Sequence, residues 1–418
     1  MNRKHSMLVQ PAKRISLLLF LLLSLPLLNT CENEGTEEPA VDQCNTPDAP
    51  GELLEATSFL SFAPADIESI LTMYGAPIGL DLNLSYTVDS YQIAYHTLNS
   101  DGELTPVSGL MLIPQGLDTL DLLSIQHGTV FKREQVGSTH PYYAPDALIT
   151  AMNGYLVVAP DYLGLGESQL LHPYLHAELS ANAVIDLIRA VRIYACQNEL
   201  ILSDNLFMAG YSEGGFVTLA TQKIIETEAE YSEEFQLTAV APMAGPYDLL
   251  GSTQNLLSRS YYNNPAYLAY IVTAYNDIYG WDRLPEIFRE PYASSIPGLL
   301  DGSLDGSAIN ANLTTNLDSL FLPDFKQSFM AGEESQLEAA LVENSPLDWG
   351  PVAPVRLFHG TADSTVFYEN AVIAYESMLA NGGLSVDLVS LPYADHGTAV
   401  FPSFHWAMLW FDSLRTAD

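Results

Sequence analysis

A short glycine-flanked serine motif stands between two apolar stretches of this chain. Gly210-Tyr211-Ser212-Glu213-Gly214 follows a strand-like apolar stretch and precedes apolar residues at helical spacing. A serine on such a sharp turn exposes its hydroxyl as a nucleophile, and the flanking glycines are needed because a side chain at either place would crowd the turn. A glycine-rich turn with an incidental serine is the alternative, so the interpretation depends on a base, an acid and hydrogen-bond donors elsewhere.

A histidine and an aspartate near the C-terminal end supply the missing base and acid. A serine hydroxyl needs a neighbouring base, usually a histidine oriented by a carboxylate. His396 follows one predicted strand and Asp363 follows the strand before it. Asp395 competes for the acid role, but adjacent side chains rarely face each other along an extended chain. We therefore predict Ser212 as nucleophile, His396 as base and Asp363 as acid, and expect His405, in an aromatic helix pattern, to be a core residue.

Two backbone N–H groups are predicted to hold the negative oxygen that forms when a serine attacks a carbonyl group. Such an oxyanion needs preset donors. One donor is expected from Glu213, the residue after the nucleophile, and the other from Thr129 in His127-Gly128-Thr129, which closes a predicted strand. An ordinary strand-ending turn is the alternative for His127-Gly128. The accompanying serine, histidine and aspartate favour the functional interpretation.

Strand and helix patterns alternate over most of the chain. The apolar stretches predict strands at 120–126, 154–159, 206–209, 237–242, 355–358 and 386–391, a hairpin at 86–114 and a helix at 177–195. This alternation predicts an α/β fold, with a mainly parallel sheet covered by helices on both faces. Ser212, Asp363 and His396 each follow a predicted strand, so all three candidates fall just beyond the carboxyl ends of strands. Their order along the chain is Ser, Asp, His.

The alternation stops in a tyrosine-rich segment. Residues 251–343 show few β patterns and several prolines, which predicts a mostly helical cap; a second helical layer of the core is the alternative. We therefore expect a catalytic domain made of residues 51–250 and 346–418, with residues 251–345 as a helical cap insertion.

The N-terminal end has the pattern of an export signal. Basic residues precede an apolar run at 15–28, which is too short for a membrane span of about 20 residues. We predict a signal peptide at 1–30. Cys31 then resembles the acylated cysteine of bacterial lipoproteins, and the acidic stretch after it resembles the surface-export signal of Bacteroidetes lipoproteins; a solvated tether over 31–50 is the plainer interpretation. Location at the outer membrane or cell surface through a lipid anchor is expected, with a secreted or periplasmic protein as alternative.

Charge and composition exclude several partners. The 418 residues carry a formal net charge of −36, which disfavours nucleic acid because its phosphates would be repelled. No phosphate-cradling loop or dinucleotide fingerprint is present. His172 and His176 have the spacing of metal ligands on a helix, but Pro173 between them favours capping or packing, so no metal is expected.

Two cysteines remain after export. An oxidising compartment permits a disulfide between Cys44 and Cys196. Two unpaired buried thiols are the alternative.

The sequence resembles the α/β-hydrolases, and among them the secretory-lipase-like esterases. The resemblance covers residues 86–250 and 345–411 and rests on the serine, aspartate and histidine contexts together with His127-Gly128-Thr129, the segments 160–166 and 172–174, and Ala244-Gly245-Pro246-Tyr247-Asp248. It implies hydrolysis of small-molecule or lipid carboxylic esters without a cofactor.

Two other functions are compatible with the same scaffold. A prolyl-type serine peptidase shares the fold, but it usually carries an N-terminal propeller, and the chain before Tyr86 is too short for one at about 40 residues per blade. A non-catalytic surface binding protein is the second alternative. The presence of competent residues at all catalytic positions counts against it.

Overall fold

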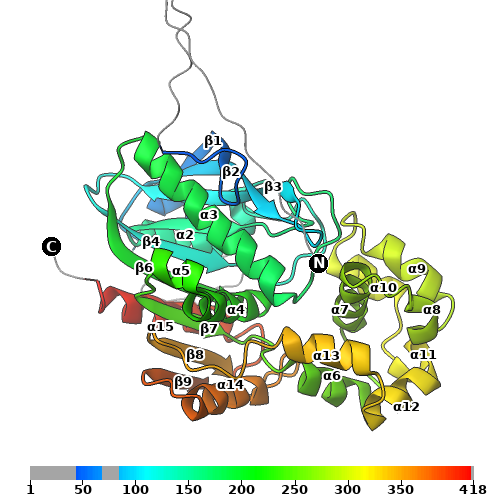
Figure 1. The fold of residues 1–418 in the computed structure, drawn as a ribbon. Helices are drawn as coiled ribbons and strands as arrows, with labels where there is room; N and C mark the ends of the chain where they lie inside the picture. Colours follow the sequence, from blue (N-terminus) through cyan, green and yellow to red (C-terminus); the bar gives the residue numbers. More distant parts are fainter. Residues whose placement is uncertain (1–43, 68–83, 416–418) are drawn as a thin grey trace, which may run out of the picture. The chain divides into compact units, whose positions relative to one another are not determined.

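The centre of the protein is a nine-stranded sheet, shown in Figure 1. The computed structural model describes residues 44–67 and 84–415. In chain order the strands are β1 (Leu53–Phe62), β2 (Val88–Leu98), β3 (Leu104–Pro114), β4 (Leu120–Gln126), β5 (Tyr155–Pro160), β6 (Leu202–Tyr211), β7 (Ala239–Met243), β8 (Val355–Gly360) and β9 (Val386–Leu391). Their spatial order is β1-β2-β3-β5-β4-β6-β7-β8-β9. The α/β fold class expected from the sequence is confirmed.

One end of the sheet is antiparallel and the rest is parallel. β1, β2, β3 and β5 pair antiparallel, and all pairings from β5 to β9 are parallel. The predicted hairpin is present as β2 and β3, with Leu98 opposite Leu104. β1 was missed because most of its residues are exposed and lack the apolar alternation of a half-buried strand. Because β4 and β6 to β9 are parallel, their carboxyl ends meet along one edge of the sheet.

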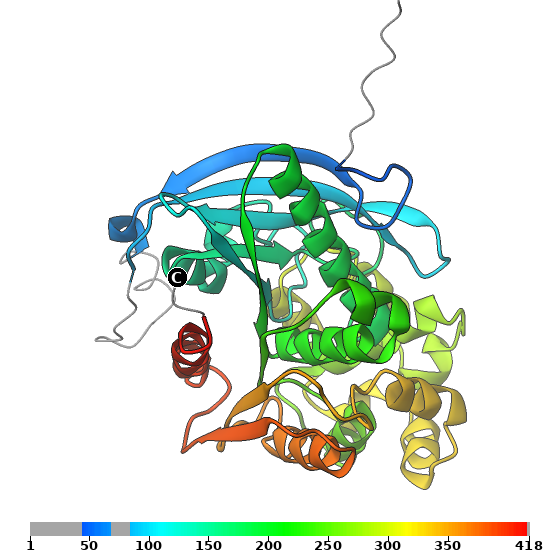
Figure 2. The same cartoon turned by 60° about the vertical axis from the view of Figure 1, so that its left-hand side comes forward.

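Helices cover both faces of the sheet, as Figure 2 shows. α3 (Ala177–Gln197), α4 (Glu213–Thr227) and α14 (Glu369–Ala380) lie on one face, and α2 (Pro145–Met152) and α15 (Val400–Asp412) lie on the other. Successive strand residues alternate between the two layers. In β4, for example, Leu122 packs with the α3 and α4 side and Leu123 with the α2 and α15 side.

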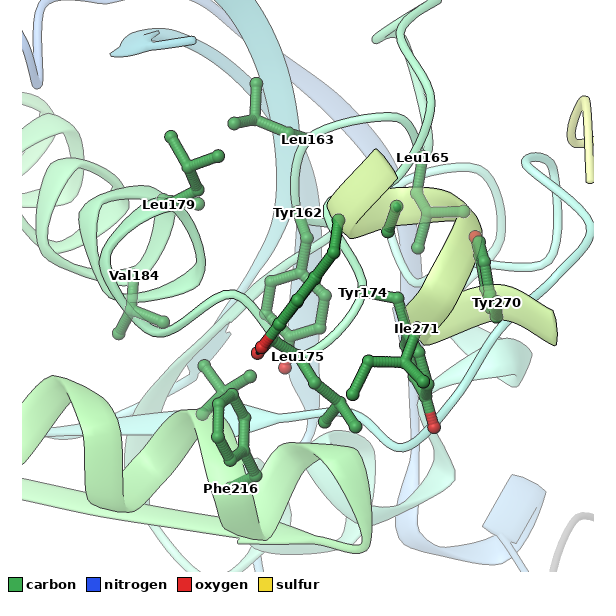
Figure 3. Packing of buried hydrophobic residues seen from close by; sticks show 14 of the residues in the cluster. Tyr162, Leu163, Leu165, Tyr174, Leu175, Leu179, Val184, Phe216, Tyr270 and Ile271 are labelled. Carbon is green, nitrogen blue, oxygen red and sulfur yellow. The ribbon is translucent and has the colours of Figure 1, made fainter. Parts of the chain in front are cut away.

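The segment between β7 and β8 is helical. Its elements are α6 (Leu249–Leu257), α7 (Pro265–Ile278), α8 (Leu284–Ile287), α9 (Tyr292–Leu299), α10 (Gly306–Asn312), α11 (Leu317–Leu320), α12 (Pro323–Ala331) and α13 (Ser335–Glu343). We call this segment the helical insertion. It contacts the sheet domain through α7: Figure 3 shows Tyr270 and Ile271 beside Tyr174, and the rings of Tyr174 and Tyr270 stack at 4.7 Å.

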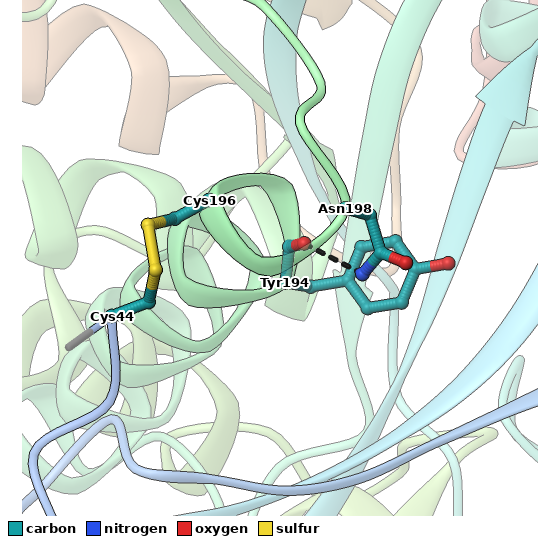
Figure 4. Close-up of a disulfide and its surroundings, with 4 residues drawn as sticks. All are labelled: Cys44, Tyr194, Cys196 and Asn198. Atoms are coloured by element: carbon teal, nitrogen blue, oxygen red, sulfur yellow. Dashed lines mark hydrogen bonds between the residues drawn. A yellow bond between two sulfur atoms is a disulfide. The ribbon is translucent and has the colours of Figure 1, made fainter. Parts of the chain in front are cut away.

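The first described residues are tied to the body of the protein. Cys44 and Cys196, at the end of α3, form a disulfide that closes a separation of 152 residues (Figure 4). The Asn45 side chain exchanges hydrogen bonds with the backbone of Leu53 at the start of β1. Residues 44–50 belong to the tether predicted over 31–50, and these contacts hold Cys44 and Asn45 against the body of the protein. The other tether residues, Cys31 and the signal segment lie outside the described residues.

Candidate active site

Ser212 occupies the turn between β6 and α4. Its φ is 60°, a left-handed value that costs a non-glycine residue on the order of 1–3 kcal/mol. Two backbone hydrogen bonds hold the turn: Ser212 N–H donates to Met243 O at 2.9 Å, and Phe216 N–H donates to Ser212 O at 3.1 Å. The turn brings the serine to the carboxyl edge of the sheet, where it borders two cavities.

The glycines of the motif lie where three backbones meet. A Cβ atom on Gly214 would overlap the carbonyl oxygen of Gln126 at the end of β4. A Cβ atom on Gly210 would lie 2.6 Å from the carbonyl carbon of Gly214 and 2.7 Å from that same oxygen of Gln126. No larger residue fits at either place without moving β4 or α4, which is the steric reason expected from the sequence.

The structure brings the predicted nucleophile, base and acid into one hydrogen-bonded chain. His396 Nε2 lies 3.0 Å from Ser212 Oγ, and His396 Nδ1 lies 2.6 Å from Asp363 Oδ2. His396 lies in the turn after β9 and Asp363 in the turn after β8. Tyr211 O–H donates to the carbonyl oxygen of His396 at 2.7 Å and so fixes the turn that carries the histidine.

Asp363 is held as a carboxylate by donors on several sides. Its Oδ1 accepts backbone hydrogen bonds from Thr365 at 2.9 Å and Val366 at 3.0 Å. The ring of His359, which is fully buried, lies 3.3 Å from Oδ2. Burial alone would raise the pKa of the Asp363 carboxyl, but the hydrogen bonds from His359 and His396 outweigh it and hold that pKa well below its usual range. Asp363 therefore presents a negative charge to His396 at any physiological pH.

Two other candidates from the sequence lie elsewhere. Asp395 is turned toward its own loop, where Oδ1 accepts backbone hydrogen bonds from Gly397 at 3.0 Å and Thr398 at 2.8 Å. The prediction that His405 is a core residue is wrong. Its position on α15 faces a cavity rather than the sheet, and the side chain is half-buried.

The predicted oxyanion donors lie beside Ser212. Glu213 is the first residue of α4, so its N–H has no intrahelical partner. Within the described residues no hydrogen bond engages the N–H of Thr129. Thr129 and Glu213 line one cavity together with Ser212. The Thr129 hydroxyl lies 3.0 Å from Tyr174 O–H, which anchors that turn.

A second histidine–carboxylate pair lies beside Ser212. The side chain of Glu213 is buried, and its Oε1 lies 2.7 Å from Nε2 of the equally buried His172. His172 Nδ1 lies 2.8 Å from the carbonyl oxygen of Leu163. Glu213 Oε2 has no partner among the described residues. This pair was not predicted from the sequence. The sequence offers one signal for it: Glu213 stands in a tightly packed turn, where its side chain is buried.

His172 and His176 do not share a helix face. α3 begins only at Ala177, and His176 is its N-cap, accepting a hydrogen bond from Leu179 N–H at 3.4 Å. His172 is part of the preceding loop. Pro173 between the two histidines led us to expect capping or packing roles. His176 caps α3, and His172 is packed in the buried loop before it.

Two of the cavities are lined by both Ser212 and Thr129. The smaller, of about 70 Å³, lies beneath the helical insertion and is bounded by α6, α7 and the turn at 365–367. The larger, of about 500 Å³, lies between α2 and α15 and is also lined by His396. Ser212 therefore borders open space on two sides.

The α/β-hydrolase fold has parallel strands that bring a serine, then an aspartate, then a histidine to one edge of the sheet. This chain has that fold and that arrangement of residues. Residues 144–274 match the family model of the secretory lipases. Over these residues the chain is similar to that family, and the fold and this match support carboxylic ester hydrolysis. A comparison with curated protein sequences finds no match.

Solved structures support the same conclusion. A Legionella pneumophila protein assigned as a hydrolase is 29% identical, with a TM-score of 0.81, over 88% of this chain and 100% of that one. The rice cell wall degrading esterase LipA from Xanthomonas oryzae is 29% identical, with a TM-score of 0.77, over the same shares. Candida antarctica lipase A, at 16% identity and a TM-score of 0.64 over 88% of this chain and 84% of that one, shares the fold. The secretory-lipase and LipA matches favour ester hydrolysis over a peptidase or a non-catalytic binding protein.

The match to a secretory family also supports export. In the part of the chain that the structure describes, no helix combines the length and the apolar character needed to cross a bilayer.

Proposed function

We propose that Ser212, His396 and Asp363 form the catalytic triad of this ester hydrolase. The observation that carries the proposal is the bridging position of His396, with one ring nitrogen 3.0 Å from the serine hydroxyl and the other 2.6 Å from the aspartate. Hydrogen bonding to Asp363 leaves Nε2 free to accept the serine proton.

In the proposed reaction, Ser212 Oγ attacks the ester carbonyl carbon while its proton passes to His396 Nε2. The N–H groups of Glu213 and Thr129 would hold the negative oxygen of the tetrahedral intermediate. The carbon–oxygen bond to the alcohol then breaks, and His396 returns the proton to the leaving alkoxide oxygen. Water attacks the acyl-serine in the same way and releases the carboxylic acid.

Replacement of the nucleophile tests this proposal. Ser212→Ala should lower turnover of p-nitrophenyl acetate by at least roughly 10³-fold and prevent labelling by a fluorophosphonate probe. Ser232→Ala, at an exposed serine on α5 (Ala229–Glu234), is the control and should behave like the native protein. Retained turnover in Ser212→Ala would rule out the triad, and faster cleavage of a proline amide than of the ester would favour the peptidase.

The helical insertion fits the role of a cap. Its helices α6 and α7 form one wall of the smaller cavity, directly over the nucleophile. We assign residues 251–345 to the cap and residues 51–250 and 346–418 to the catalytic domain.

For location, we propose a lipoprotein at the outer membrane or cell surface. The support is the apolar run at 15–28 followed by Cys31 and an acidic stretch. Cys31→Ser should move the protein from the membrane fraction to the soluble fraction of a cell that processes lipoproteins. If the native protein and the variant were both in the soluble fraction, the protein would be secreted or periplasmic.

A further inference from the structure

The larger cavity has an apolar wall formed by α15. Val400, Phe404 and Met408 are spaced by four residues, so they share one face of the helix, and all three line the cavity. α15 follows the turn that carries His396. The apolar wall therefore starts beside the catalytic base and leads away from it along the helix.

The opposite wall, formed by α2 and its C-cap residue Asn153, carries polar groups. Asp146, Thr150 and Asn153 are spaced by four and three residues and line the same cavity. Thr150 is only 1% exposed, and its hydroxyl oxygen has no hydrogen-bond partner among the described residues. The side-chain oxygen of Asn153 is also buried and without a partner there. Buried polar atoms normally have partners, so these two oxygens mark places where a ligand would supply hydrogen bonds.

The two cavities contact different parts of the catalytic machinery. The leaving alcohol oxygen must come within hydrogen-bond reach of His396 Nε2, because that nitrogen protonates it. His396 lines the larger cavity and is not among the described residues that line the smaller one. The smaller cavity instead contains Glu213 and the apolar side chains of Leu256 and Leu268.

We propose that the cavity between α2 and α15 binds the leaving alcohol, a neutral alcohol with an apolar body and a further hydroxyl group, while the smaller cavity accepts a short acyl group. This inference rests on the proposed triad. The sizes of the two cavities support this division. The smaller cavity, of about 70 Å³, holds only a few atoms, whereas the larger, of about 500 Å³, holds a bulky group. Asp146 and Asp412 line the larger cavity without any lysine or arginine among its described residues, which disfavours a negatively charged alcohol.

A pair of isomeric esters tests the division directly. Hexyl acetate carries its long chain on the alcohol, and ethyl hexanoate carries it on the acid. Released acid, measured by titration at constant pH, should give a kcat/KM at least roughly ten-fold higher for hexyl acetate. A preference for ethyl hexanoate would overturn the assignment.

Two variants locate the effect. Met408→Trp should fill the larger cavity and lower the hexyl acetate to ethyl hexanoate ratio of kcat/KM at least roughly ten-fold. Leu256→Ala should enlarge the smaller cavity and lower the same ratio by improving ethyl hexanoate. Leu379→Trp, at an exposed leucine on α14, is the control for added bulk and should leave the ratio unchanged. An effect of Met408→Trp on ethyl hexanoate alone would reverse the assignment.

A third variant tests the extra hydroxyl group. Thr150→Val keeps the shape of the side chain and removes its unpaired oxygen, so the protein should fold. Loss of one hydrogen bond should lower kcat/KM for 1,6-hexanediol monoacetate, relative to hexyl acetate, on the order of five-fold. An unchanged ratio overturns the hydroxyl requirement. Retained turnover in Ser212→Ala would instead overturn the triad itself, so the two failures are distinguishable.

Discussion

Two histidine–carboxylate pairs flank Ser212, and they differ in what else surrounds them. In the first pair, His396 has 21% of its side chain exposed and borders a cavity, while Asp363 is held by backbone N–H groups. In the second pair, His172 and Glu213 are 1% and 0% exposed, at a similar distance of 2.7 Å. The two pairs therefore contain similar groups at similar distances. They differ in exposure, because His396 borders a cavity, whereas His172 is enclosed by the protein.

The difference teaches that solvent and cavity access distinguishes the proposed catalytic pair from the buried pair. In the proposed mechanism His396 exchanges protons with Ser212 and the substrate, because one of its ring nitrogens faces the serine hydroxyl. Both ring nitrogens of His172 are already engaged, by Leu163 and Glu213. The buried pair instead fixes Glu213, whose backbone N–H is a proposed oxyanion donor. We expect variants of the first pair to lose activity and variants of the second pair to lose stability.

The largest effect is expected at the acid of the first pair. Asp363→Asn should lower kcat for p-nitrophenyl acetate on the order of 10⁴-fold, because the amide cannot stabilise the imidazolium form of His396. Glu52→Gln is a matched control, since Glu52 pairs with His96 at 2.9 Å but lies on the β1 side of the sheet. A loss in Asp363→Asn no greater than in this control would break the comparison.

A smaller effect, mainly on stability, is expected at Glu213. Glu213→Ala should lower the free energy of unfolding by about 4 kcal/mol, because it leaves His172 buried without its partner. Urea unfolding followed by tryptophan fluorescence measures this loss. The fall in kcat should be smaller than in Asp363→Asn.

The conservative variant separates the contact from the charge. Glu213→Gln keeps an oxygen or amide group facing His172 and should retain more stability than Glu213→Ala. If Glu213→Ala were fully stable yet as inactive as Asp363→Asn, the two pairs would have to exchange roles.

The smallest effect is expected at His176, a buried histidine that has no carboxylate partner among the described residues. Burial lowers the pKa of His176 from 6.5 to about 4. Between these pH values the unfolded chain binds a proton that the folded chain refuses, so this residue's contribution to stability is intact above pH 6.5 and falls as the pH drops toward 4. The total loss amounts to about 3 kcal/mol.

His176→Asn isolates this contribution. Asparagine is a good N-cap for α3 and does not titrate in this range. The difference in unfolding free energy between pH 7 and pH 4 should therefore shrink by about 3 kcal/mol relative to the native protein. Equal pH profiles for the two proteins would show that burial does not suppress the protonation of His176.

The sequence predicted the strands that carry the candidate site because local patterns define them. β4 and β9 have the predicted bounds, and β6 and β8 contain the predicted ones. Ser212 and His396 were recognisable because each stands in a short motif next to a strand. The triad and oxyanion roles remain predictions.

The remaining features depend on contacts between distant segments. The His172–Glu213 pair joins residues 41 positions apart, and neither residue has a motif that points to the other. The larger cavity exists because α2 and α15 lie apart on one face of the sheet, a spacing set by tertiary packing. His405 was misplaced for the same reason: its helix pattern was correct, but the cavity that it faces has no sequence signature.

The Cys44–Cys196 bond also determines how the protein carries mechanical load. A pull on the N-terminal end of the chain reaches the sulfur–sulfur bond before it reaches β1, and it passes into α3, a helix of 21 residues packed against the sheet. The hydrogen bonds between β1 and β2 are thus shielded from that force. A protein held by its N-terminus in moving fluid would keep its edge strand in place for as long as the bond stays oxidised.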